Sequence, residues 1–339
     1  MKSRLMLIFI IITLLICNGC AKESKNNEVN KGNANNEVLD KQEVQIVDLD
    51  SNKRPIAVMI NNSKAARPQS GLSDAYLVYE IMVEGGITRM MALYTEDFSE
   101  EKIGSVRSSR HNYLDYVLEN DAIYVHWGGS PQAYSDINKF DIDNLDGMVY
   151  GEKYFTTDKT LKRSLEHTRF TSSQFIKEGI QKLKFNTTTD NGYLLNYTAD
   201  TVDLSLKENS KVANNVTIKY SNYQTSSYIY NSEEQLYYRS MSGNKHVDLV
   251  SGEQYKFKNI IAYSVKYNTI DSSGRQDLEN VGEGEGVYIT NGYSIPIKWS
   301  KKDRSSKTKY THLDGTEIQV SDGNTFIQIY PTIGKITIS

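Results

Sequence analysis

Residues 80–131 read EIMVEGGITRMMALYTEDFSEEKIGSVRSSRHNYLDYVLENDAIYVHWGGSP. The stretch joins apolar, strand-like runs through a Gly-Gly pair, which is typical of a hairpin turn. We therefore predict two antiparallel strands over residues 75–83 and 87–94, with Gly85 and Gly86 between them. The alternative is a helix that Ser73 would cap and that would end at Gly85. Val, Ile and Tyr dominate the run, which favours the hairpin.

The predicted hairpin fixes which charged residues share a face. With the two glycines as the turn, Met82 faces Arg89, and Glu80, Glu84 and Arg89 lie on one otherwise apolar face. A buried carboxylate costs several kcal/mol unless it is paired. Arg89 is therefore expected to pair with the two glutamates, either as a structural ion pair or as part of a functional site.

A helix is predicted after residues 103–110, which read IGSVRSSR. Ser108 or Ser109 can cap it. Its apolar positions follow a helical spacing at Tyr113, Leu114, Val117 and Leu118. Arg107 and Arg110 would flank its N-terminus, where unpaired N–H groups already favour an anion and arginines add bidentate recognition. In the alternative interpretation these arginines pair with the glutamates of the hairpin.

A second strand-to-helix transition follows. A strand over residues 122–127 carries His126 near its end, Gly128 and Gly129 form a loop, and Ser130 caps a helix that starts at Pro131. Folds of the α/β type place ligands at such strand ends. His126 is thus a candidate site residue, although a lone histidine is more often structural.

The remaining sequence indicates an α+β protein. A buried strand is expected at residues 56–60 and a helix after Ser172 or Ser173, which makes residues 52–192 a mixed α/β domain. Residues 193–339 show strand signals only, with hairpins at Asn291-Gly292 and Asp314-Gly315. Further strands are predicted at residues 216–220, 227–230, 236–241, 260–267 and 324–330. We expect a mainly β sandwich or open barrel here, with a core separate from that of the first domain.

The N-terminus has the pattern of an export signal. Lys2 and Arg4 precede residues 5–16, which are apolar except for Thr13 and too short to span a bilayer. Cys20 follows a small residue, as in a bacterial lipobox. We therefore predict a lipoprotein signal peptide over residues 1–19 and a lipid on Cys20. Since the only other cysteine lies within that signal, no disulfide is expected in the exported protein.

Residues 20–51 are predicted to be a flexible tether, because they are rich in Asn, Lys and Glu and poor in apolar residues. The formal net charge is −3, and it becomes −5 once the two basic residues of the signal are removed. A nucleic-acid-binding protein would need a basic stripe, so nucleic acid is not an expected partner. The expected location is the outer face of the cytoplasmic membrane.

Several long runs resemble the YerB-like lipoproteins, exported proteins of Gram-positive bacteria built around a domain of unknown function. They are RPIAVMINN (54–62), ARPQSGLSDAYLVYE (66–80), VEGGITRMMALY (83–94), IGSVRSSR (103–110), DAIYVHWGGSPQA (121–133), GEGEGVYITNGYSIPIKWSKKD (282–303) and DGTEIQVSDGNTFIQIYP (314–331). The resemblance implies that the matching polar positions belong to the family pattern: Arg67, Glu80, Glu84, Arg89, Arg107, Ser108, Arg110 and His126. His167 falls where the family tends to have a histidine, but Glu166 precedes it where a proline is expected.

Two functions are compatible with these residues. The first is a binding module for an anionic cell-envelope ligand or a partner protein, with the ligand held by Arg67, Arg89, Arg107, Ser108, Arg110, Gly128, Gly129 and Ser130. The alternative is an extracytoplasmic hydrolase or transferase for envelope glycan or phosphodiester, with catalytic candidates Glu80, Glu84 and His126. Binding is favoured because no nucleophile elbow, Walker loop or catalytic cysteine is found in the sequence.

No cofactor or metal is expected, since the sequence lacks a zinc motif. The central hypothesis is that one polar site brings together six residues: Glu80, Glu84, Arg89, Arg107, Arg110 and His126.

The lipid anchor is directly testable. Cells that express the chain and are fed radiolabelled palmitate should label it, and Cys20→Ala should remove the label, because this thiol is the predicted attachment point. Label that survives in Cys20→Ala would contradict the prediction.

Overall fold

The computed structural model describes residues 43–339. The predicted signal peptide, Cys20 and most of the predicted tether lie outside the described residues. Residues 43–51, assigned above to the tether, are part of the fold: Val47 is buried, and the Asp322 carboxylate accepts hydrogen bonds from the N–H groups of Gln45 and Ile46, both at 2.9 Å. Within the described residues, no helix is long and apolar enough to cross a membrane.

A mixed sheet of eleven strands forms the middle of the molecule. Its order is β10-β20-β19-β16-β23-β2-β3-β1-β5-β6, with β21 paired to β20. The strands are β1 (Ile56–Asn61), β2 (Leu77–Met82), β3 (Thr88–Tyr94), β5 (Ile123–His126), β6 (Asn144–Asp146), β10 (Lys211–Val212), β16 (Asn259–Val265), β19 (Gly282–Thr290), β20 (Tyr293–Lys301), β21 (Lys309–Thr311) and β23 (Thr325–Pro331). The predicted hairpins β2–β3 and β19–β20 are confirmed.

A second sheet comes entirely from the C-terminal half. It contains β11 (Asn215–Lys219), β12 (Thr225–Asn231), β13 (Leu236–Met241), β14 (Asn244–Lys245), β15 (Lys256–Phe257) and β24 (Lys335–Ile338). Three small sheets complete the strands: β4 (Ile103–Gly104) with β7 (Thr156–Thr157) and β8 (Arg169–Thr171), β9 (Tyr197–Thr198) with β22 (Val320–Ser321), and β17 (Tyr267–Thr269) with β18 (Gln276–Leu278).

The α-helices all lie in the first half of the described chain: α1 (His111–Glu119), α2 (Pro131–Lys139), α3 (Gly147–Tyr150) and α4 (Ser173–Leu183). Ser130 caps α2 and Ser172 caps α4, as predicted. The predicted cap of α1 is wrong, because Arg110 holds the N-cap position and no side chain caps this helix. Short 3₁₀ turns, including η3 (Glu84–Gly86), connect several elements. The predicted α+β class, with an all-strand second half, is confirmed.

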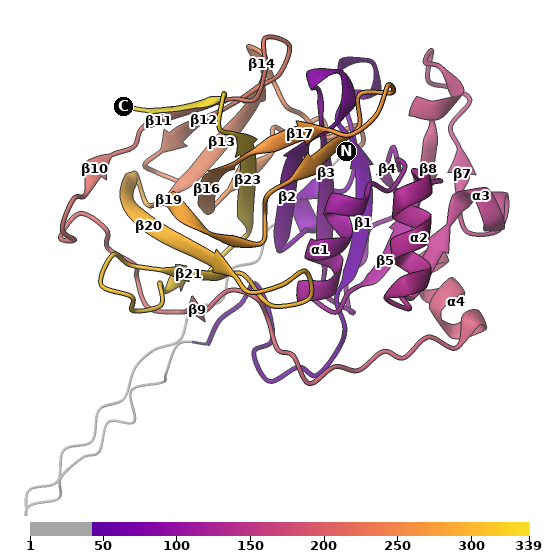
Figure 1. The fold of residues 1–339 in the computed structure, drawn as a ribbon, viewed down its shortest axis with the longest axis horizontal. Helices are drawn as coiled ribbons and strands as arrows, with labels where there is room; N and C mark the ends of the chain where they lie inside the picture. The colour runs from indigo at the N-terminus through magenta and orange to yellow at the C-terminus, as the bar shows by residue number, and fades with distance from the viewer. Residues whose placement is uncertain (1–42) are drawn as a thin grey trace, which may run out of the picture. The chain divides into compact units, whose positions relative to one another are not determined.

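The expectation of two separate cores is wrong, because both faces of the large sheet are covered by residues of both halves. One face packs α1 and α2 beside residues of β16, β20 and β23; the other packs α4 and the second sheet. Figure 1 shows β23 between β16 and the indigo β2, and it runs parallel to both. The domain boundary predicted near residue 193 stays a prediction. Strands from both sides of it build one sheet.

The turn between β2 and β3 changes the predicted register by one residue. Val83 donates its N–H to the Ile87 carbonyl at 2.8 Å, so three residues form the loop rather than two. Ile81 therefore faces Arg89, and Glu80 faces Met90. Since a slip of one residue moves a side chain to the other face, Glu80 points toward the second sheet while Arg89 points toward α1.

A buried ion pair ties α1 to the C-terminal half. The Glu119 carboxylate of α1 accepts hydrogen bonds from Lys301 Nζ at 2.7 Å, Thr308 Oγ1 at 2.6 Å and Tyr79 OH at 2.7 Å. Glu119 and Lys301 are both buried, so neither charge has water as an alternative partner. Removing one partner of such a pair leaves the other charge without compensation.

Lys301→Ala should lower the free energy of unfolding by about 3–5 kcal/mol, because Glu119 would stay buried without a counter-ion. Urea titration of the folded chain measures this. Lys302→Ala is the matched control: its side chain is exposed, so the midpoint should barely move. Equal effects of the two changes would contradict the prediction.

Candidate functional site

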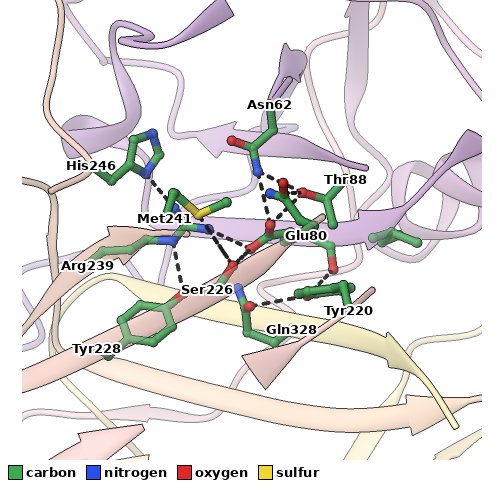
Figure 2. Close-up of polar contacts among 12 residues, drawn as sticks. Asn62, Glu80, Thr88, Tyr220, Ser226, Tyr228, Arg239, Met241, His246 and Gln328 are labelled. Carbon is green, nitrogen blue, oxygen red and sulfur yellow. Dashed lines mark hydrogen bonds and ion pairs between the residues drawn. The ribbon is translucent and has the colours of Figure 1, made fainter. Parts of the chain in front are cut away.

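Glu80 lies in a buried polar network between the two sheets (Figure 2). One carboxylate oxygen accepts from Arg239 Nη2 at 2.6 Å and Ser226 Oγ at 2.9 Å. The other accepts from Thr88 Oγ1 at 2.6 Å and Asn62 Nδ2 at 3.0 Å. Burial opposes ionisation, but Arg239 and the hydroxyl donors outweigh it, so the pKa of Glu80 lies below its usual value. Glu80 therefore joins β2 to β12 and β13, and it is fully buried.

His246 completes this network on the far side of Arg239. Its Nδ1 accepts from Arg239 Nη1 at 2.5 Å, and its Nε2 lies 2.7 Å from Gln69 Oε1. An arginine can only donate, so Nδ1 is unprotonated and Nε2 carries the proton. Burial, then the charges of Arg239 and Arg67, place the pKa of His246 well below its usual value. The imidazole is thus held neutral.

Glu84 forms a second, separate cluster with Arg89 and Arg110. Arg89 Nη2 and Arg110 Nε each donate to its carboxylate at 3.0 Å, and Arg110 Nη2 adds a further short contact. Burial raises the pKa of Glu84, but the Arg110 hydrogen bond and the two positive charges lower it to about 2. Arg89 also donates to the Ser108 carbonyl, which links this cluster to the neighbouring loop.

Two segments predicted to bear ligand-binding residues lie side by side. Ser109 N donates to the Gly128 carbonyl at 2.8 Å, and Trp127 N donates to the Arg107 carbonyl at 3.1 Å. Beside them opens a cleft of about 650 Å³. Its walls are Val106, Arg107, Ser108, Trp127, Gly128, Gly129, Tyr134, Met148, Leu165, Glu166 and Arg169.

The cleft carries two arginines and one carboxylate among its lining residues. Arg107 Nη2 lies 2.5 Å from Glu166 Oε2, and the Glu166 side chain is 49% exposed. The Arg169 guanidinium stacks 4.4 Å from the Trp127 ring centroid and donates to the Thr157 hydroxyl. Within residues 43–339, no carboxylate oxygen lies within 4 Å of the Arg169 guanidinium. The cleft is therefore suited to an anion.

Two backbone features belong to the loops that line the cleft. In the described part of the chain, the N–H groups of Ser108 and Gly129 donate no hydrogen bond. Gly147 lies against the Trp127 indole so closely that an added Cβ would be 2.1 Å from ring atom Cε3. Only glycine lets α3 pack against this indole, which positions Met148 at the cleft.

The remaining predicted residues support the structure around the cleft. His126 is fully buried, with Nδ1 2.9 Å from the Gly128 carbonyl and Nε2 3.2 Å from Asn144 Oδ1, and burial lowers its pKa. Ser130 accepts the Ala133 N–H as the cap of α2. His167 contacts the Asn61 amide at 2.8 Å, beside Glu166.

Arg67 does not reach the cleft, because it donates to the Asn62 carbonyl and the Gln224 side chain near the Glu80 network. The hypothesis of one converging polar site is wrong for Glu80, which lies on the other face of the sheet with Arg239, whereas Arg89 contacts the Ser108 carbonyl and His126 contacts the Gly128 carbonyl. Arg107, Ser108, Gly128 and Gly129 meet at the cleft; Glu84, Arg89 and Arg110 form their own cluster; and Glu80 belongs to the buried network. Within residues 43–339, no three His, Cys, Asp or Glu side chains are placed to hold a metal ion.

The sequence interpretation missed Trp127, Met148, Leu165, Glu166 and Arg169 as cleft residues. The run LKRSLEHTRF (161–170) gave no clear local signal for Leu165, Glu166 and Arg169, since single apolar residues in a polar loop are ordinary. Arg169 enters the site only because β8 pairs with β4 and β7. No local pattern predicts that pairing.

The neutral state of His246 gives a pH-dependent stability. The unfolded chain binds a proton near the ordinary pKa of 6.5, whereas the folded chain does so only at much lower pH. The free energy of unfolding should therefore fall as the pH drops below about 6.5. This pH window differs from that of Glu80. The lowered pKa of Glu80 adds stability that is lost only below about pH 4.5.

His246→Gln should flatten the fall of Tm between about pH 7 and pH 5, because glutamine can accept from Arg239 and donate to Gln69 without titrating. Differential scanning calorimetry measures the slope. His126, His167 and His312 also have lowered pKa values, so a smaller slope of the same sign remains. His312→Gln is the control at a less buried site. An unchanged slope in His246→Gln would refute this assignment.

Comparison with known proteins agrees with the fold and leaves the activity open. Residues 44–186 match the family described as "Protein of unknown function (DUF3048) N-terminal domain", and residues 216–327 match its C-terminal domain. The chain is 30% identical over 291 residues to "Putative lipoprotein YerB" of Bacillus subtilis (strain 168), covering 85% of this chain and 84% of that protein.

The crystal structure of YerB protein from Bacillus subtilis superposes with a TM-score of 0.72 at 28% identity, covering 84% of this chain and 94% of that one. The arrangement of the two halves matches in the two proteins. The predicted resemblance is thereby confirmed. The chain belongs to the YerB-like family, whose N- and C-terminal domains are both described as being of unknown function.

Proposed function

We propose that this protein is a lipid-anchored binding module on the outer face of the cytoplasmic membrane, and that its cleft takes an anionic cell-envelope ligand. The lipobox-like Cys20 and the lipoprotein name of the Bacillus relative support the anchor. The observation that carries the binding function is the pair of cleft arginines, Arg107 and Arg169. One faces an exposed glutamate, and the other has no carboxylate within 4 Å among the described residues.

The arginines behind the cleft strengthen its positive field. Burial, and then the positive charges of Arg110 and Arg107, lower the pKa of Arg89 to about 10. The three guanidinium groups are therefore close enough to act on one another. Glu84 compensates two of them, Arg89 and Arg110. An anion in the cleft therefore gains from the field as well as from direct contact with Arg107 and Arg169.

The Glu166 carboxylate would pair with the Arg107 guanidinium as long as no ligand is bound. An exposed ion pair of this kind contributes about 0–1 kcal/mol, so an incoming anion displaces it at little cost. A phosphate or carboxylate could then bind Arg107 in bidentate geometry and accept the N–H groups of Ser108 and Gly129. The free Glu166 carboxylate would turn toward solvent.

The alternative of a hydrolase or transferase has less support. It requires a carboxylate that is free to exchange a proton in the cleft. Glu80 is buried outside the cleft, Glu84 is held by two arginines, and His126 is buried with both ring nitrogens in contact with other groups. Glu166 is the one carboxylate among the residues that line the cleft, and its Oε2 is already paired with Arg107 at 2.5 Å.

Arg107→Gln should weaken binding of glycerol 3-phosphate at least tenfold while Tm stays within about 2 °C, since the Arg107 side chain is 26% exposed and its ion pair is a surface one. Glu166→Gln should strengthen the same binding, because the competing carboxylate is removed. Isothermal titration of the chain expressed from residue 20 with Cys20→Ser measures both constants.

Arg275→Gln is the matched control, because this arginine forms a partly exposed ion pair with Asp271 outside the cleft. It should leave the titration unchanged. A structural role for Arg107 would give the opposite result: Arg107→Gln would unfold the protein at markedly lower urea, and glycerol 3-phosphate would not bind the unchanged chain.

A further inference from the structure

The rim of the cleft is apolar and exposed. Met148 is 67% exposed, Leu165 is 60% exposed, and both line the cleft beside Arg107. Tyr134, which also lines the cleft, adds a partly exposed ring. Apolar side chains scattered singly over a surface need no explanation, but several gathered around one cleft mark a contact site.

The backbone that presents these side chains is fixed. Asp146 Oδ1 accepts the N–H of Met148 at 2.9 Å and that of Gly128 at 2.7 Å, so one carboxylate connects the start of α3 to the glycine loop. Gly147 packs α3 onto the Trp127 indole. The backbone at Met148 is thus anchored to the glycine loop of the cleft, and the flexible methionine side chain can adapt to its partner.

We infer that the ligand is an anionic amphiphile: a phosphate group at Arg107 and Arg169 that carries an apolar chain over Met148 and Leu165. The inference rests on the proposed function and names the class of its ligand. A soluble anion would use the arginines and leave the apolar rim in water, whereas an amphiphile covers both.

The two parts of such a ligand contribute in different ways. Phosphate is a strong acceptor for guanidinium and backbone N–H donors. Each methylene of the chain that the cleft removes from water strengthens binding about threefold to fourfold. Affinity should therefore rise with chain length until the chain extends past the rim.

The test compares three soluble probes with the chain expressed from residue 20 with Cys20→Ser. Glycerol 3-phosphate offers the charged group alone, dihexanoyl phosphatidic acid offers the charged group with chains, and dihexanoyl phosphatidylcholine offers the same chains on a zwitterion. Trp127 fluorescence reports binding, because the other tryptophan, Trp299, is buried away from the cleft. Chains that carry bromine should quench Trp127 when they lie in the cleft.

Phosphatidic acid should bind at least tenfold more tightly than either other probe. Met148→Ser with Leu165→Ser should bring phosphatidic acid to within about threefold of glycerol 3-phosphate and leave the affinity for glycerol 3-phosphate unchanged. The control is Ile333→Ser, because this side chain is 91% exposed and lies outside the cleft. It should change neither the affinity for phosphatidic acid nor that for glycerol 3-phosphate. Since all three side chains are exposed, Tm should be unaffected.

Equal binding of phosphatidic acid and glycerol 3-phosphate would overturn the inference and leave the proposed anion site standing. So would a double serine variant that binds both probes as the unchanged chain does. Equal binding of phosphatidylcholine and phosphatidic acid would overturn the role of the charged group. Failure of every probe to bind would overturn the proposed function as well.

Discussion

The hydrogen bonds between β2 and β23 are the interaction on which the rest of the structure depends. They place a strand from the end of the chain beside one from its start, in parallel, in the middle of an eleven-stranded sheet. The Glu80–Arg239 pair on one face and the Glu119–Lys301 pair on the other both follow from this pairing. Charges buried in this way add specificity of alignment more than net stability, because desolvation offsets much of their attraction.

The same central sheet explains why the charged residues of the first half have such different roles. Side chains of β2 and β3 alternate between a face covered by a sheet and a face covered by helices, so neighbouring residues enter unrelated environments. The loops beyond the strand ends, at residues 106–109 and 127–130, supply six of the residues that line the cleft. The cleft is thus a feature of loops set on a rigid scaffold, which is where binding residues usually lie.

Local signals in the sequence predicted the elements better than their contacts. The β2–β3 hairpin, the Ser130 cap and the Asn291-Gly292 turn follow from turn and cap chemistry within a few residues. The register of the β2–β3 hairpin could not be predicted in this way, because a Gly-Gly pair suits both a two-residue and a three-residue loop. Arg239, the partner of Glu80, lies 159 residues away. Four of the eleven residues that line the cleft, Arg107, Ser108, Gly128 and Gly129, were predicted from glycines and arginines near strand and helix ends. Arg169 and the apolar rim depend on tertiary pairing.

The central position of β23 bears on the order in which the protein can fold. Until residues 325–331 are available, β2 has an unpaired edge and apolar side chains on both faces, a combination prone to aggregation. The first half of the chain therefore cannot complete the sheet before the second half has been synthesised and translocated. A chain that crosses a membrane from its N-terminus would have to be kept from self-association until translocation ends, and its late, long-range closure predicts slow folding.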